Sequence, residues 1–160
     1  EDVRSAAADT LVCLREVLSE ANLEHLATCL PSGQGGDEAD ELQALVLQTL
    51  AGVAAAVTSH AVRSTLSTLA ASCLVDEAAA TRAAALAALA AFGRASAAHV
   101  DAVAALLEDE DAPVRLAAVG ALARLGRAES HGEALSELLG DRDLNVRSAA
   151  TAALKQWGLA

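Results

Sequence analysis

The sequence "DAPVRLAAVGALARLG" at residues 111–126 is followed 32 residues later by "DLNVRSAATAALKQWG" at residues 143–158. The correspondence extends upstream, so that residues 99–126 align with residues 131–158 at one constant offset. An internal repeat of fixed period is typical of a chain built by stacking copies of one structural unit. The matching positions include His99 and His131, Leu107 and Leu139, Asp109 and Asp141, Arg115 and Arg147, and Gly126 and Gly158.

Weaker copies of the unit occur nearer the N-terminus. At an offset of 33, Asp76 and Arg82 stand where the next unit has Asp109 and Arg115. The opening segment "DVRSAAADTLVCL" also echoes "NVRSAATAALKQW" in the last unit. We therefore expect a single domain over residues 1–160, with divergent repeats over 1–66 and regular repeats over 67–158.

Each unit carries two helical patterns. In the first, Val100, Val103 and Leu107 recur at helical spacing and form one apolar stripe. Asp109 and Asp111 then interrupt the pattern with side chains suited to capping a second helix. Neither helix is apolar enough to be stable alone, so each pair must stack on the next pair.

The second helix of the unit has its own start and stop signals. Pro113 suits the first turn of a helix, where its missing N–H costs nothing. Val114, Ala118 and Leu122 share one face, and Gly126 follows where a left-handed residue often ends a helix.

Applied along the chain, these signals predict an all-α fold of about nine helices. The composition agrees, because the sequence is 54% apolar but contains one Trp, one Phe and no Tyr or Met, which favours closely packed helices. "PSGQGGDEADE" at residues 31–41 is predicted to be a long loop, either a binding insertion or a tolerated surface insertion. The helices are expected near residues 3–19, 21–30, 38–57, 60–74, 78–92, 97–108, 112–125, 131–139 and 144–157.

The unit resembles the HEAT repeat, in particular the short variety of the phycobilisome-lyase-like group. The resemblance rests on Leu-Leu, an Asp, Val-Arg with the Arg six residues beyond that Asp, then Ala-Ala and Leu-Gly. It is strong over 67–158 and partial over 1–66. It implies an α-solenoid, a right-handed superhelix of stacked antiparallel helix pairs, with a structural ladder between neighbouring repeats formed by Asp76, Arg82, Asp109, Arg115, Asp141 and Arg147.

Charge and cysteine content limit the partners. The net charge is −11, and residues 1–41 hold ten acidic against two basic residues, so a nucleic-acid partner is not expected. A basic or helical protein is the more natural ligand, although acidity also serves solubility. Cys13, Cys29 and Cys73 form neither a disulfide framework nor metal spacing. With no leader segment and no continuous apolar span, we expect a cytoplasmic protein in a reducing compartment, without membrane insertion.

Catalysis is not expected. Phosphate, dinucleotide and nucleophile motifs do not occur in the sequence, and the His-Glu pairs of the HEAT-repeat iron hydroxylases are missing as well. His99 and His131 fall at equivalent positions of successive units, too far apart to share one metal ion. We therefore expect neither cofactor nor metal. The resemblance also leaves open a bilin-lyase-like subunit, for which no chromophore site can be named.

The leading hypothesis is a non-catalytic protein-interaction scaffold. By resemblance, second helices line the concave side of such a solenoid, and small residues there would admit a partner helix or only permit curvature. The alternative is a structural segment of a longer chain or large assembly, because the sequence opens on a second-helix pattern and ends on Trp157 and Leu159 without a polar cap. The predicted partner-binding residues are Leu116, Gly120, Arg124, Ser148 and Lys155.

Overall fold

Helix pairs arranged in a row make up the structure, a computed structural model that describes residues 37–54, 57, 59–126 and 128–158. Within these ranges all regular structure is helical and no strand occurs. The α-helices are α3 (Asp37–Val53), α4 (His60–Ser72), α5 (Ala79–Phe92), α6 (Val100–Ala105), α7 (Ala112–Leu125), α8 (Gly132–Glu137) and α9 (Leu144–Gln156). Short 3-10 helices span Cys73–Val75, Gly93–His99, Leu106–Glu108, Ala128–His131 and Leu138–Gly140.

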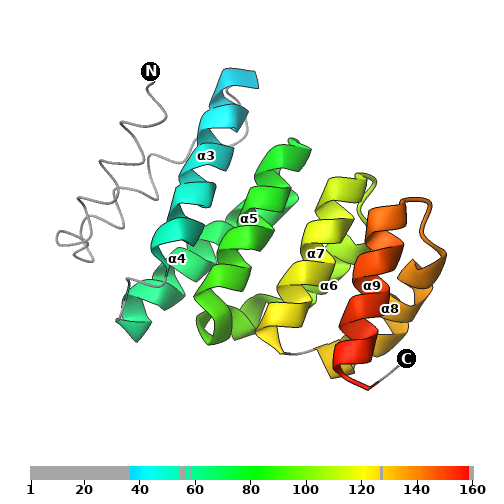
Figure 1. Cartoon of the computed structure of the whole chain (residues 1–160). Coiled ribbons are helices and arrows are strands. Elements are labelled where there is room, and N and C mark those ends of the chain that lie inside the picture. The colour runs from blue at the N-terminus through cyan, green and yellow to red at the C-terminus, as the bar shows by residue number, and fades with distance from the viewer. Residues whose placement is uncertain (1–36, 55–56, 58, 127, 159–160) are drawn as a thin grey trace.

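The helices form two layers. Helices α3, α5, α7 and α9 lie side by side in one layer, each packed against the next (Figure 1). Helices α4, α6 and α8 lie behind them, and each packs against the second helix of its own pair. This arrangement confirms the expected stacking of helix pairs.

The apolar core lies between the two layers. Apolar residues at helical spacing supply it, so that Val103, Leu107, Val114 and Leu122 are all buried. Helix α5 is the most buried element, with nine of its 14 residues inside, because it lies between α3 and α7. By length and composition alone, residues 79–108 are apolar enough to span a membrane, although α5 itself ends at Phe92 and half of the apolar window is buried inside the structure.

Several predicted boundaries were wrong. The helix expected at 97–108 is a six-residue α-helix, α6, between two 3-10 helices, and α8 is flanked in the same way. Such short helices commonly end in tighter 3-10 turns. Helix α3 ends at Val53 rather than at 57. Its last two residues, Gly52 and the β-branched Val53, both weaken a helix.

The predicted loop at 31–41 is also too long, because α3 begins at Asp37. Four acidic residues in its first five positions suit the positive end of a helix dipole. Residues 31–36 lie outside the described part of the chain. The helices expected at 3–19 and 21–30 fall there as well, so the described residues do not show nine helices.

Gly126 ends α7 in the left-handed conformation that its position predicted, with φ 67° and ψ 26°. We expect Gly126→Ala to destabilise the fold by about 1 kcal/mol, because a Cβ disfavours this conformation. Gly120→Ala, within α7 and facing open space, is the matched control and should stabilise by about 0.7 kcal/mol. Urea unfolding followed by circular dichroism measures both, and equal effects of the two substitutions would refute this account of Gly126.

Candidate protein-interaction surface

The seam between successive pairs carries an arginine that contacts two units at once. Arg82, in the first turn of α5, is buried and donates through Nε and Nη2 to Oδ2 and Oδ1 of Asp109, at 2.8 and 2.9 Å. Its Nη1 donates to the backbone carbonyls of Asp76 and Glu77, both at 2.9 Å. Arg82 therefore joins the turn that begins its own helix to the turn of the following unit.

Arg115 repeats this geometry one unit later. Its Nε and Nη2 donate to Oδ2 and Oδ1 of Asp141 at 2.7 and 2.9 Å, and its Nη1 donates to the carbonyls of Asp109 and Glu110. A planar guanidinium that binds both oxygens of a buried carboxylate fixes orientation as well as distance. Each unit is consequently held in a set register on its neighbour.

The aspartates of the ladder also shape their own turns. Oδ1 of Asp76, Asp109 and Asp141 accepts the backbone N–H two residues further on, at 2.9, 2.9 and 2.7 Å. The sequence analysis predicted that Asp109 and Asp111 cap the second helix of their unit, and the structure differs from that prediction. Asp143 caps α9 through Oδ1, whereas the Asp111 side chain makes no capping bond and contacts Arg82 Nη2 at 3.1 Å instead.

The two ends of the ladder differ from its middle. Helix α3 contains no arginine, so no residue of α3 pairs with Asp76 as Arg82 pairs with Asp109. At the other end, Arg147 donates through Nη1 to the carbonyl of Asp141 at 2.7 Å. The six ladder residues thus form two carboxylate bridges, Arg82 to Asp109 and Arg115 to Asp141.

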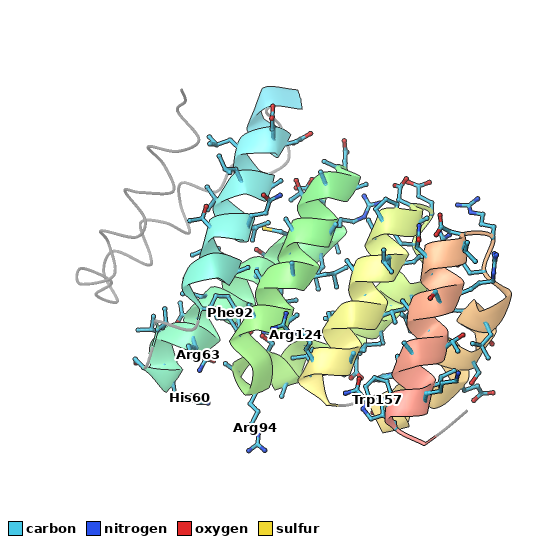
Figure 2. The ribbon with its side chains drawn as sticks, viewed as in Figure 1. His60, Arg63, Phe92, Arg94, Arg124 and Trp157 are labelled. Carbon is cyan, nitrogen blue, oxygen red and sulfur yellow. The ribbon has the colours of Figure 1, made fainter. Side chains whose placement is uncertain are left out.

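The five predicted partner-binding residues all lie exposed on α7 and α9. Leu116, in α7, is 37% exposed although it is apolar, and Gly120 and Arg124 follow it on the same helix. Ser148 and Lys155 are exposed on α9. We call this the second-helix face, defined by Leu116, Gly120, Arg124, Ser148 and Lys155. Figure 2 shows Arg124 near the lower ends of α5 and α7, on the side of the α3, α5, α7 and α9 layer.

Comparison of the sequence with known protein families finds one match. The family model for HEAT repeats matches residues 66–155. The chain belongs to the HEAT-repeat family. No curated protein matches the chain. HEAT repeats generally serve protein interaction and are usually non-catalytic scaffolds.

The ionisation of Asp109 and Asp141 is set by their position between HEAT units. Burial alone would raise the pKa of Asp109, but hydrogen bonds from Arg82 and the N–H of Asp111, with the charges of Arg82 and Arg115, outweigh it and lower the pKa. The hydrogen bonds from Arg115 lower the pKa of Asp141 against the effect of burial. Both carboxylates therefore remain charged in neutral solution.

A basic group that the sequence analysis did not identify lies at the opposite end of the HEAT units from the ladder. His60 and Arg63 from α4 and Arg94, which follows α5, line a shallow hollow with Phe92. Figure 2 shows Arg94 extending away from the ribbon at this lower edge. The buried Nε of Arg63 has no hydrogen-bond partner among the described residues. One feature of the sequence could have indicated this group: Arg94 directly follows Gly93, the glycine that ends α5.

The described residues contain no group of three or more His, Cys, Asp or Glu side chains that could hold a metal ion. His99 and His131 occupy equivalent positions, each immediately before a first helix. His131 Nε2 lies 3.7 Å from Asp101 Oδ1, and the Asp101 side chain is exposed on the layer of α4, α6 and α8.

Removing one ladder charge tests the energetics of the seam. Asp141→Asn leaves Arg115 buried without its counter-charge, so we expect a loss of about 3 kcal/mol at neutral pH, measured by urea unfolding. A carboxylate with a lowered folded pKa contributes all its stability above the unfolded value of about 3.9 and loses it as the pH falls to the folded value. The difference from the unmodified chain should therefore be constant above about pH 5 and shrink below about pH 4.

The matched control for this experiment is Asp101→Asn. Asp101 is fully exposed and lies at 3.7 Å from its only ionic neighbour among the described residues, so its replacement should leave stability unchanged at every pH. A difference for Asp141→Asn that does not vary with pH, or that equals the control, would contradict the role of ionic pairing at the seam.

Proposed function

We propose that this HEAT-repeat domain is a non-catalytic scaffold that binds a protein partner on the second-helix face. The observation that carries the proposal is the exposure of apolar Leu116 on that face, whose other four residues are small, polar or charged. Leu116 has one neighbour along the helix, Gly120, that adds no side chain. An apolar side chain beside such a flat surface suits the apolar stripe of a partner helix.

The distribution of charge supports a basic character for the partner. The ladder uses Asp109 and Asp141 internally, since Arg82 and Arg115 neutralise them. The neighbouring glutamates Glu77, Glu108 and Glu110 are exposed along the same edge. These acidic turns adjoin the layer of α3, α5, α7 and α9 at the end where α5 and α7 begin. Basic residues of a partner would find counter-charges there.

The proposal includes the finer features expected from the repeat pattern. We propose a right-handed superhelix with the second-helix face on its concave side, in a protein that requires no cofactor. A buried free thiol at Cys73 supports a reducing, cytoplasmic location.

Leu116→Asp tests the binding proposal directly. Proteins captured by the immobilised chain from its source cells are identified, purified and titrated against the chain by calorimetry. We expect Leu116→Asp to weaken binding of such a partner at least tenfold, because it places a charge at the centre of an apolar contact. Circular dichroism should show unchanged helicity, since Leu116 lies at the surface.

Val75→Asn is the control for Leu116→Asp, because it removes an exposed apolar side chain without adding a charge beside Glu77. Val75 is 89% exposed and lies in the turn before α5, away from the second-helix face. Its replacement should leave the affinity unchanged. Equal affinity of the unmodified chain and Leu116→Asp would exclude the second-helix face as the binding site. Binding that does not weaken with added salt would contradict a basic partner at the acidic turns.

A further inference from the structure

A hollow at the place where α4 begins and α5 ends is rich in basic side chains. Figure 2 shows two arginines and a histidine gathered at this lower edge of the molecule. The chain as a whole has a net charge of −11, so this group is opposite in sign to the rest of the protein. The described residues that line the hollow include no Asp or Glu. We call it the basic hollow, and its lining residues are His60, Arg63, Phe92, Gly93, Arg94 and Ala95.

Arg63 has a donor that the described residues do not satisfy. Its Nε is buried and has no hydrogen-bond partner among them, although the residue as a whole is half-buried. A buried N–H without an acceptor is costly, so such groups are normally paired. In Arg82 and Arg115, the two buried arginines, Nε donates to an aspartate. The guanidinium of Arg63 is therefore available to an acceptor that enters the hollow.

The end of α5 does not use these arginines. Basic residues near the end of a helix often bind its last carbonyl groups. Here the carbonyl of Leu89 accepts a hydrogen bond from Oγ of Ser96 at 2.9 Å, and Oγ of Ser67 donates to Oγ of Ser96 at 3.0 Å. Among the described residues, no ion pair involves Arg63 or Arg94. A buried pair of serines thus completes this helix end, and the arginines have no structural partner there.

The size and chemistry of the basic hollow favour a carboxylate on a larger partner. Its volume is about 290 Å³, at the lower limit of the roughly 300–1,000 Å³ of small-molecule sites. It therefore suits the end of one side chain better than a whole metabolite. A guanidinium binds both oxygens of a carboxylate, and Arg115 binds Asp141 in this way in the same chain.

We propose that the basic hollow binds a glutamate or aspartate side chain presented by an acidic segment of a partner protein. Arg63 pairs with the carboxylate, while His60 and the exposed Arg94 at the rim add charge-assisted contacts. The first turn of α4 adds the positive end of a helix dipole. This inference does not depend on the second-helix face, because the hollow lies elsewhere and takes a ligand of the opposite charge.

NMR titration of the full chain tests the proposal. The probes are acetylated and amidated hexaglutamate, the same peptide made of glutamine, glutarate and inorganic phosphate. We expect hexaglutamate to shift the Nε–H signal of Arg63 and the amide signals of Gly93, Arg94 and Ala95, in a saturable manner that weakens with added salt. Equal shifts with the glutamine peptide, or none with hexaglutamate, would overturn the proposal. Tighter binding of glutarate or phosphate than of hexaglutamate would assign the hollow to a free anion and overturn it as well.

Variants separate the basic hollow from general charge attraction. Arg63→Lys keeps the charge but cannot bind both carboxylate oxygens, so it should weaken hexaglutamate binding about tenfold. Arg94→Gln should weaken it about threefold and leave Tm unchanged, because Arg94 is exposed. Arg142→Gln is the matched control, since it removes an exposed charge beside α9 and should not alter the affinity. Unchanged affinity of Arg63→Lys and Arg94→Gln, or an equal loss in Arg142→Gln, would overturn the proposal.

Discussion

The structure depends on one interaction, the bidentate hydrogen bonding of a buried arginine to an aspartate of the next unit. Burying a guanidinium or a carboxylate alone is costly, and burying both is tolerable only when their hydrogen bonds are satisfied. Arg115 meets this condition with two bonds to Asp141 and two to the carbonyls of its own turn. The arginine therefore holds its neighbour and its own helix start at once, and a shift of either unit breaks several bonds together.

Small side chains make this register possible. Helix α5 places Ala84, Ala85 and Ala88 in the core, which lets it pack closely between α3 and α7. Aromatic residues are few, and Phe92 is the one aromatic side chain fully buried in the described residues. A core of this kind gives stability through many close contacts and gives little specificity of position by itself. The charged bridges supply that specificity, and the repeat pattern of the sequence records both requirements.

The internal repeat made most of the fold predictable. Matching residues at a constant offset located α5, α7 and α9 to within a residue or two, because Pro113 and Gly126 mark a start and a stop. The prediction that Arg82 pairs with the next unit rested on the family resemblance. The spacing alone also allowed pairing within one unit. The 3-10 ends of α6 and α8 were not predictable, since an apolar stripe has nearly the same pattern in a short α-helix and in a 3-10 turn. The basic group of His60, Arg63 and Arg94 was missed because tertiary packing brings α4 beside the end of α5.

A double-mutant cycle on Arg115 and Asp141 tests the central claim most directly. The free energy of unfolding is measured for the chain, for Arg115→Ala, for Asp141→Ala and for both together. If the bridge sets the seam, the two residues should be coupled by about 2 kcal/mol, with the double variant much more stable than the sum of the single losses predicts. Losses that add to within about 0.3 kcal/mol would show that apolar stacking alone holds the units together.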